Sequence, residues 1–285
     1  MEWLERMSEA VAYMEANLTH EVDMAEVARR AYSSSFHFQR MFHMLTDMTV
    51  AEYIRKRRLT MAAQELVMTS ARVLDISLKY GYDSPESFAR AFRKVHGLSP
   101  SEARNFGVEL KAFPRISFHL SLKGDKDMDY RIVNREMFTV VGKMIRVSYK
   151  DGENLRRIPE FWQTCYADGT VDRLRAMRAD GVVLGICMNT DHEKEEFTYA
   201  IAVESDDVVS DGLTKDTIPA STWAAFPSTG GLPEALQGVW SRIFEEWLPA
   251  TSYQHSGGAE LEVLPPGDDC AADYRSEVWI PVVKK

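Results

Sequence analysis

Residues 81–100 read GYDSPESFARAFRKVHGLSP, and this stretch decides how the first third of the chain folds. Gly81 is typical of the left-handed turn at which helices end. Ser84 followed by Pro85 is typical of a helix start, because serine caps free backbone N–H groups and proline suits the first helical position. The stretch therefore predicts a turn and then a helix from Ser84 to about His96.

The same pattern occurs 50 positions earlier in the chain. Both copies read S-x-x-x-F-x-R-x-F, formed by Ser34, Phe38, Arg40 and Phe42 in the first and by Ser84, Phe88, Arg90 and Phe92 in the second. Aromatic residues four positions apart share one helix face, and the Arg between them points away from it. Each copy predicts a helix-turn-helix unit. A helical bundle with merely solvated arginines is the alternative that spacing alone leaves open.

The residues around the two copies also have the features of helices. Apolar residues recur every three or four positions from Trp3 to Leu18. Asp23 can cap a helix over 24–30, and Ser34 or Ser35 can cap one that runs to about Leu45. Thr49 begins a segment through Met68 without Gly or Pro, and a short helix is expected over 73–80. We therefore predict an all-α N-terminal double helix-turn-helix domain.

Charge divides the chain into two regions. The whole chain of 285 residues carries a net charge of -9. Residues 29–104 hold 13 Lys/Arg against 7 Asp/Glu, whereas residues 111–285 hold 20 against 28. A basic region separated from an acidic one suggests two domains with different partners, and the phosphate backbone of DNA is the usual partner of a basic domain.

Composition excludes several classes of protein. With 45% hydrophobic and 27% charged residues, the chain is expected to fold and not to be disordered throughout. No apolar run approaches the ~20 residues of a membrane-spanning helix, and the acidic N-terminus does not resemble a secretory signal. A cytoplasmic protein is expected. Cys165, Cys187 and Cys270 fit neither a disulfide framework nor a zinc cluster.

The pattern changes after Pro100. We place the DNA-binding domain at residues 1–107, a linker at 108–126 and a second domain at 127–285. Two amphipathic helices are expected around Phe161 and around Trp240, among strand-like runs at 130–133, 138–142, 182–188, 197–203, 223–226, 261–264 and 278–283. Strands with one helix followed by strands with another predict an α+β domain of two similar halves.

The N-terminal region resembles the AraC family of transcription regulators. The resemblance rests on the motif of residues 81–100, on Leu59–Leu66 and Ile76, and on residues 36–42, FHFQRMF, which resemble the first recognition helix of the Rob, MarA and SoxS branch. It covers about 107 residues. The sequence departs from the family pattern at Tyr32 and Asp47, where glycine is usual, and at Ala103-Arg104, where the family usually has Tyr-Arg.

This resemblance implies that each unit inserts its second helix into the major groove, with the two helices roughly 34 Å apart. Groove-facing positions fall on Ser35, Phe36, Gln39 and Arg40 in the first helix and on Glu86, Ser87, Arg90, Arg93 and Lys94 in the second. Gln reads adenine and Arg reads guanine in bidentate fashion. In the basic run 55–58, Arg57 is a candidate phosphate contact, although such a run can also form a solvated face or pair with acids on neighbouring helices.

Residues 127–285 resemble the GyrI-like effector-binding domain. The matching segments include Phe138–Gly142, Ile158-Pro159 with Trp162, Phe197–Tyr199, Ile218–Ala220, Trp247–Pro249 and Glu277–Val282. The resemblance implies two pseudo-symmetric halves that enclose a pocket for hydrophobic, often cationic, small molecules.

A pocket for a lipophilic cation needs apolar area, ring faces and a carboxylate. Glu277 is the candidate carboxylate, because an acid in an otherwise apolar strand is costly unless it is used. The candidate walls are the aromatic residues Phe161, Trp162, Tyr199, Trp223 and Trp279. Aromatic residues at such spacings are also common in cores. Glu262 is the rival acid.

Catalysis is the competing class of function. The sequence has no phosphate-binding glycine loop, no metal-spaced His/Cys set and no nucleophile elbow. Some GyrI-like proteins resemble hydrolases, which would use Glu277 and Tyr199 to activate a water. We expect instead a regulator without catalytic residues, metal or cofactor, whose partners are double-stranded DNA and a small effector, with RNA polymerase as a further candidate.

Overall fold

The computed structural model describes residues 2–105, 107–118, 128–207 and 212–285, which form two compact units. The first unit consists of residues 1–35 and 48–121, and the second of residues 36–47 and 122–285. This division differs from the predicted domains in two respects, because it reassigns residues 36–47 and extends the first unit into the predicted linker. Residues 36–47 lie within the predicted DNA-binding region but belong to the second unit. Part of the predicted linker, residues 119–126, lies outside the described residues.

The first unit is helical, as predicted. Its elements are α1 (Glu2–Ala16), α2 (Met24–Arg30), α4 (Val50–Met68), α5 (Val73–Lys79), α6 (Pro85–His96) and the 3₁₀ turn η1 (Glu102–Arg104). The caps expected at Asp23 and Ser84 are present, because each side chain accepts a backbone N–H at the start of a helix, and Thr49 caps α4 in the same way. At Thr49 the cap is reciprocal, since Glu52 also accepts the Thr49 N–H.

Apolar residues of α4, α5 and α6 form the core of the second helix-turn-helix unit. This core contains Leu59, Ala62, Ala63, Leu66, Ile76, Tyr80, Phe88, Phe92 and Ala103. Phe88 and Phe92 are fully buried, as the repeated motif predicts. The turn passes through Gly81 with φ of 78°, a conformation that glycine adopts without strain.

Residues 108–118 pack along α4 and do not form a free linker. The Phe113 N–H donates to Thr60 Oγ1 at 3.0 Å, and the Ile116 N–H donates to the Tyr53 hydroxyl at 3.4 Å. The Phe113 ring meets the edge of the Tyr53 ring with centroids 6.1 Å apart. The described part of the predicted linker is therefore an integral part of the first unit.

The second unit is built on an antiparallel sheet. Its strands are β1 (Arg131–Arg135), β2 (Phe138–Ser148), β3 (Val183–Asp191), β4 (Glu196–Glu204), β5 (Thr214–Ile218), β6 (Ser221–Thr229), β7 (Tyr253–His255), β8 (Glu260–Leu264) and β9 (Arg275–Lys284). The order across the sheet is β1-β6-β9-β8-β3-β4-β2-β5, and β7 pairs with β9 beside this path. Every predicted strand is present, whereas β5 and β7 were not expected.

The strand order has the two-fold symmetry predicted for the halves. Strands β2, β3 and β4 of the first half occupy places equivalent to those of β6, β8 and β9 in the second. The two edge strands are exchanged, because β1 precedes β2 in the chain but pairs with β6, while β5 precedes β6 but pairs with β2. The halves meet where β3 pairs with β8.

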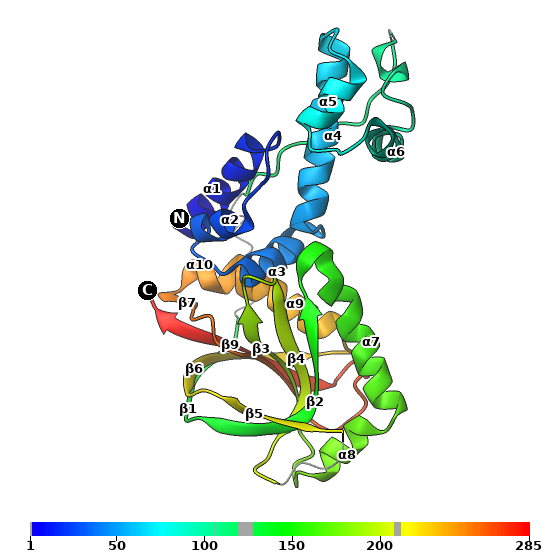
Figure 1. Cartoon of the computed structure of the whole chain (residues 1–285). Coiled ribbons are helices and arrows are strands. Elements are labelled where there is room, and N and C mark those ends of the chain that lie inside the picture. Colours follow the sequence, from blue (N-terminus) through cyan, green and yellow to red (C-terminus); the bar gives the residue numbers. More distant parts are fainter. Residues whose placement is uncertain (1, 106, 119–127, 208–211) are drawn as a thin grey trace. The chain divides into compact units, whose positions relative to one another are not determined.

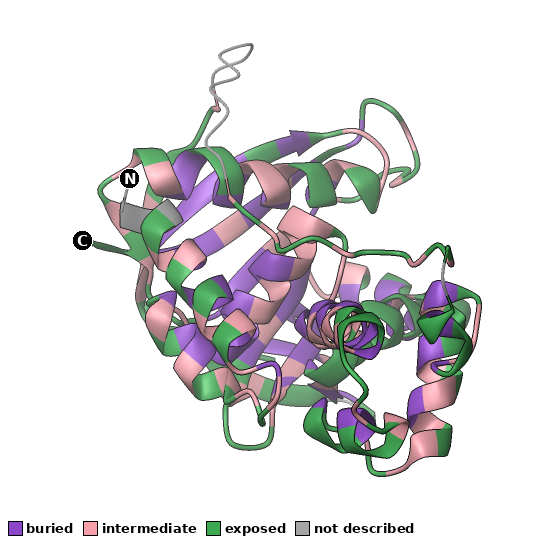
Figure 2. Cartoon of the chain, turned by 90° about the horizontal axis from the view of Figure 1, so that it is seen from above, coloured by how far each residue is buried: buried purple, intermediate pink, exposed green. Residues whose placement is uncertain are grey.

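Helices cover one face of this sheet. They are α7 (Glu153–Ala167) and α8 (Thr170–Ala176) in the first half and α9 (Glu234–Arg242) in the second. The 3₁₀ turn η2 (Lys150–Gly152) precedes α7, and α9 continues through the π-helical turn η3 (Ile243–Trp247) into α10 (Leu248–Ala250). Figure 1 shows α7 running beside β2. In Figure 2 buried residues concentrate in the central strands, while the outer sides of the helices are exposed. Helix α8 was not predicted.

Each face of the sheet has its own core. On the helix side, Phe161, Cys165 and Leu174 pack against Tyr199 and Ile201. On the other side, Trp223, Leu261 and Ile186 pack with Trp279. None of the described helices has the length and apolar character needed to cross a membrane.

Candidate recognition helices and effector site

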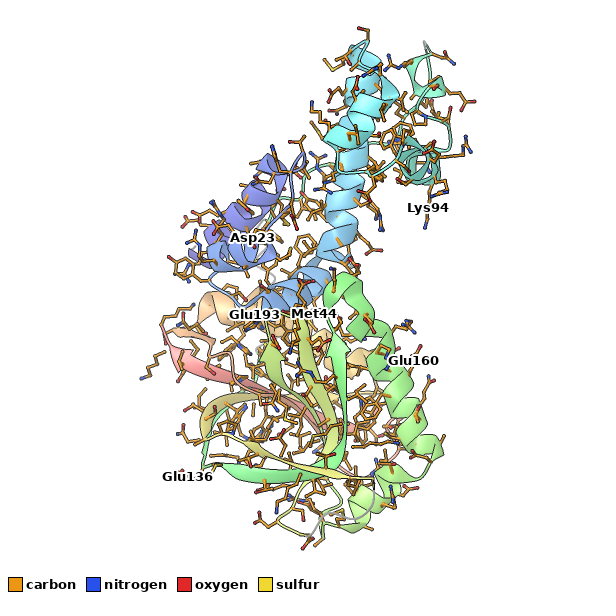
Figure 3. The ribbon with its side chains drawn as sticks, viewed as in Figure 1. Asp23, Met44, Lys94, Glu136, Glu160 and Glu193 are labelled. Atoms are coloured by element: carbon orange, nitrogen blue, oxygen red, sulfur yellow. The ribbon has the colours of Figure 1, made fainter. Side chains whose placement is uncertain are left out.

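Helix α6 presents a polar, mainly basic face to solvent. Glu86, Arg90, Arg93 and Lys94 are exposed, while Phe88 and Phe92 anchor the opposite side of the helix. Figure 3 shows the Lys94 side chain pointing away from α6. The helix ends at Gly97, whose φ of 83° closes it in the left-handed conformation. The Ser87 hydroxyl donates to the Ser84 carbonyl at 2.8 Å, so it takes part in the helix start.

The guanidinium group of Arg57, the predicted phosphate contact, is bound by other parts of the protein. Its Nε and Nη2 atoms each donate to a carboxylate oxygen of Glu15 at 2.8 Å, and Nη1 donates to the Phe113 carbonyl at 2.5 Å. The residue is buried. Its contacts follow the alternative interpretation, in which a cation of the basic run pairs with an acid on a neighbouring helix. Arg58 is also engaged, since it donates to the carbonyls of Leu18 and His20.

Helix α3 (Ser35–Thr46), the first predicted recognition helix, belongs almost wholly to the second unit. The exception is its first residue, Ser35, which belongs to the first unit and whose hydroxyl donates to the Met24 carbonyl at 3.4 Å. The Phe36 ring lies 4.5 Å from that of Phe197 and 5.4 Å from that of Tyr149. The predicted base-reading residues Phe36, Gln39 and Arg40 therefore have protein partners.

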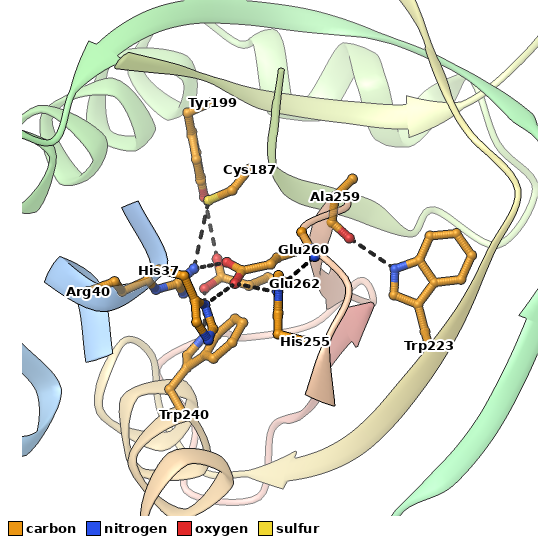
Figure 4. Close-up of polar contacts among 11 residues, drawn as sticks. His37, Arg40, Cys187, Tyr199, Trp223, Trp240, His255, Ala259, Glu260 and Glu262 are labelled. Atoms are coloured by element: carbon orange, nitrogen blue, oxygen red, sulfur yellow. Dashed lines mark hydrogen bonds and ion pairs between the residues drawn. The ribbon is translucent and has the colours of Figure 1, made fainter. Parts of the chain in front are cut away.

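Arg40 lies between aromatic and acidic side chains of the second unit, a cluster that we call the recess (Figure 4). Its guanidinium carbon is 3.8 Å from the centroid of the Trp240 ring, a cation–π geometry. Its Nη1 donates to the carboxylate of Glu260 and lies 3.9 Å from the Cys187 sulfur. Only 13% of the Arg40 side chain and 3% of the Glu260 side chain are exposed, so this ion pair is well shielded from water.

A second carboxylate, that of Glu262, completes the recess. It accepts a hydrogen bond from Trp240 Nε1 at 3.2 Å and another from the Tyr199 hydroxyl at 3.4 Å. Tyr199 in turn accepts from Trp162 Nε1 at 2.8 Å. Because Glu260 and Glu262 are two residues apart in β8, both side chains face the same side of the sheet. The recess therefore has two acids and three aromatic side chains around one cation.

The two carboxylates differ in the direction in which their pKa values are shifted. Burial raises the pKa of Glu262, and the positive charge of Arg40 offsets this only in part. Burial acts on Glu260 in the same direction, but the charge of Arg40 together with the neighbouring His255 and His37 holds the pKa of Glu260 well below its usual range. Burial also keeps the pKa of Tyr199 well above its usual value. Glu260 is thus the firmly ionised acid of the recess.

Two histidines border Glu260. The rings of His37 and His255 stack with centroids 4.2 Å apart, and the His255 Nε2 atom is 3.2 Å from Glu260 Oε1. Burial, together with the neighbouring His255, lowers the pKa of His37 to about 4. The ligand atoms of these three residues lie within 4.8 Å of one another, and such a set can bind zinc. Arg40 already neutralises Glu260, and its fixed positive charge opposes a metal ion there.

The predicted pocket residues do not meet in one place. Cys187 on β3 pairs with Tyr199 on β4 and, on its other side, with Glu260 on β8. Glu277 on β9 pairs with Val263 on β8. Directly paired residues share a face, and residues 260 and 263 are an odd number apart, so Glu277 faces the other side of the sheet. There it forms a two-point ion pair with Arg131 at 2.7 and 2.8 Å and accepts from Trp279 Nε1.

The aromatic residues divide in the same way. Phe161, Trp162 and Tyr199 lie on the helix side, while Trp223 and Trp279 belong to the core of the other side. Trp223 is fully buried and donates to the Ala259 carbonyl at 3.0 Å. Two of the five predicted wall residues are thus structural. The same separation excludes the Glu277–Tyr199 pair that the hydrolase alternative required.

Sequence reasoning missed Glu260, Trp240, His255 and Cys187. The signal was present in the alternation Glu260-Leu261-Glu262, which puts two acids on one face of a strand. What the alternation did not show is which face of the sheet the helices cover. Without knowing which face is covered, the simpler interpretation was that Glu262 faces solvent.

Comparison with known proteins gives the family. The model of the integron-associated effector binding protein Cass2 matches residues 131–282, more than half of the chain. The chain belongs to this effector-binding family. A helix-turn-helix domain model matches residues 27–105. The protein is thus an AraC-family transcription regulator with a GyrI-like effector-binding domain, and both resemblances drawn from the sequence are confirmed.

Individual relatives match one or both parts of this effector-binding regulator. The HTH-type transcriptional activator AarP of Providencia stuartii is 41% identical over 95 residues, which are 33% of this chain and 70% of AarP. The right origin-binding protein of Escherichia coli (strain K12) is 27% identical over 283 residues, 95% of each chain. The structure of SAV2435 bound to tetraphenylphosphonium matches with 22% identity and a TM-score of 0.49, over 55% of this chain and 94% of that one.

Proposed function

We propose that this regulator contacts DNA through α3 and α6 and responds to a hydrophobic organic cation that binds in the recess around Glu260 and Glu262. Transcription regulation follows from the family. The DNA-contacting residues and the class of effector are the new parts. Regulators of this kind that activate transcription need a contact with RNA polymerase, which we include as a proposed partner. A cytoplasmic location follows from the proposed work on DNA.

The exposed face of α6 supports the DNA part of the proposal. Arg90, Arg93 and Lys94 are exposed on one helix whose aromatic side is held in the core. A phosphate backbone attracts such a face, and an Arg at its centre can reach a base edge. Arg57 is left out of the proposed contacts because Glu15 holds it.

One observation carries the effector part. The recess already holds an organic cation, the guanidinium group of Arg40, over the ring of Trp240 and against the ionised Glu260. A weakly hydrated cation with a flat or aromatic surface gains both ring contact and charge neutralisation here. Glu260 therefore takes the place that the sequence interpretation gave to Glu277.

The charge of the recess can be tested with two probes of similar shape. Because Arg40 fills the recess, the test starts from Arg40→Ala, to which tetraphenylphosphonium and the neutral triphenylphosphine oxide are titrated by calorimetry. Adding Glu260→Gln should weaken the cation at least tenfold and leave the neutral probe little changed, because a buried charge without its partner is strongly disfavoured.

A matched control is Glu277→Gln in the same Arg40→Ala background, since Glu277 lies on the other face of the sheet. It should leave the affinity of both probes unchanged. Equal weakening of cation and neutral probe by Glu260→Gln would overturn the proposed effector class. So would stronger weakening of the cation by Glu277→Gln.

A further inference from the structure

Four residues within one and a half turns of α3 are engaged by the second unit. Phe36 packs on Phe197, and Arg40 pairs with Glu260. His37 stacks on His255 at 4.2 Å and meets the edge of Phe244 at 5.0 Å, and Gln39 Nε2 is 3.4 Å from Glu195 Oε1. Contact on this scale combines apolar burial, stacking and a shielded ion pair. We call α3 docked in this state, because these side chains hold it against the sheet and helices of the second unit.

Three of the four docked side chains, those of Phe36, Gln39 and Arg40, are ones that the AraC resemblance assigns to bases. Phe36 is 6% exposed, and Arg40 has its guanidinium between Trp240 and Glu260. A side chain buried in this recess is out of reach of a base edge in the major groove. Docking of α3 and DNA reading by α3 therefore exclude one another.

Arg40 also occupies the position proposed for the effector. Its planar cation uses the two features of the recess that select a cation, the ring of Trp240 and the ionised carboxylate of Glu260. A free cation in the recess would need the same ring and the same carboxylate. Docking of α3 and binding of the effector therefore exclude one another as well.

We infer that α3 is an internal ligand of the effector site, and that an organic cation displaces Arg40 and thereby frees the first recognition helix for DNA. The inference rests on the proposed function and adds its regulation. A ligand shifts such an equilibrium by binding more tightly to one of the two states, here the state in which α3 is free. The apparent affinity of the effector is its intrinsic affinity multiplied by the fraction of molecules in which α3 is free. Effector and DNA then favour the same state, in which α3 is free.

Docking can be tested without any effector. Arg40→Glu places a third carboxylate beside Glu260 and Glu262 and should expel α3 from the recess. Hydroxyl-radical labelling of the full chain, read by mass spectrometry, then measures the exposure of Phe36. We expect Phe36 oxidation to rise severalfold in Arg40→Glu. The control is Arg156→Glu on α7, an exposed arginine that pairs with Glu160 on the same helix, which should leave Phe36 oxidation as it is in the parent.

Competition is tested with tetraphenylphosphonium titrated to the parent chain, to Arg40→Ala and to Arg156→Ala. The cation should bind Arg40→Ala at least tenfold more tightly than the parent, because the internal competitor is gone. Arg156→Ala should bind as the parent does. Saturating the parent with the cation should also raise Phe36 oxidation toward the level of Arg40→Glu.

The outcomes separate the two proposals. If the cation binds neither Arg40→Ala nor the parent, the proposed effector class fails, and Phe36 labelling still decides whether α3 is docked. If the cation binds parent and Arg40→Ala equally, or if Phe36 is already fully labelled in the parent, the internal-ligand inference is overturned. A cation that binds tightly without raising Phe36 oxidation overturns it too.

Discussion

The two proposed recognition helices α3 and α6 carry the same motif, but their outer faces have different surroundings. In both, the paired phenylalanines are fully buried, at Phe38 and Phe42 in one and at Phe88 and Phe92 in the other. The arginine between them is exposed in α6 at Arg90, whereas in α3 Arg40 lies in an acidic recess of the second unit. A repeated motif thus fixes how a helix is anchored without fixing what its outer face contacts.

The largest difference is expected when each central arginine is removed. Arg40→Ala leaves Glu260 buried without a cation and should lower the free energy of unfolding of the second unit by about 3 kcal/mol. Arg90→Ala removes an exposed side chain and should change stability by less than about 0.5 kcal/mol. Urea unfolding at pH 8, where Glu260 is ionised, measures both. Equal effects would show that the Arg40–Glu260 pair makes no net contribution to the free energy of unfolding.

The next difference is a dependence on pH that only α3 should have. His37 faces His255, Glu260, Arg40 and Phe244, and burial lowers its pKa to about 4 from an ordinary value of 6.5. The docked state therefore binds fewer protons than the free state, and docking weakens as pH falls from 6.5 toward 4. At pH 5.5 the docking equilibrium should shift by about tenfold.

Glu260 acts in the same direction only at lower pH, since docking holds its pKa well below the usual range. Phe36 oxidation measured between pH 7.5 and 5 gives the profile, and His37→Asn should flatten it. A profile that His37→Asn leaves unchanged would assign the pH dependence to the carboxylates alone.

Binding to random-sequence DNA should depend on α6 more than on the basic run of α4. Lys94→Ala should lower the slope of log affinity against log salt by about 1, since one phosphate contact is lost. Arg57→Ala should leave this slope unchanged while lowering stability, because Glu15 then lacks its partner. Fluorescence anisotropy at a series of salt concentrations measures the slopes. The reverse result would move the phosphate contact from α6 to α4.

The smallest expected difference lies at the two helix ends. After α3 the Asp47 N–H donates to the His43 carbonyl at 2.8 Å. After α6 the Gly97 N–H donates to the Arg93 carbonyl, also at 2.8 Å. Both residues are left-handed, with φ of 53° and 83°. Asp47→Gly should stabilise by up to about 0.5 kcal/mol, and Gly97→Ala should destabilise by about 1 kcal/mol. Thermal unfolding of the two variants checks the signs.

Local chemistry made the elements predictable. The helix starts at Asp23 and Ser84 followed from side chains that cap N–H groups, and the start at Thr49 followed from a segment without Gly or Pro. Seven strands followed from short apolar runs. The short, polar strand β5 and the three-residue β7 carry no such signal. Tyr32, with φ of 50°, shows that a turn can keep its backbone shape without the usual glycine.

The site was less predictable than the elements, because it depends on contacts between distant parts of the chain. Tyr199 and Trp162 were expected to line a pocket and do lie together, joined by a hydrogen bond. Glu277 was chosen over Glu262 because its strand is more apolar, but its charge is met by Arg131 on β1. No local pattern links Arg40 to Glu260, which lie 220 positions apart.

The exchange of edge strands makes the two halves of the sheet interdependent. Strand β1 pairs with β6 and β5 pairs with β2, so each half lends its first strand to the other. A cut between β4 and β5 would leave the first strand of each fragment, β1 or β5, without its partner strand. The strands that pair with the other half would then have open edges, and open edges invite association. Two such fragments, mixed, should therefore recover the sheet by complementation, and either one alone should self-associate in the manner of a strand-swapped dimer.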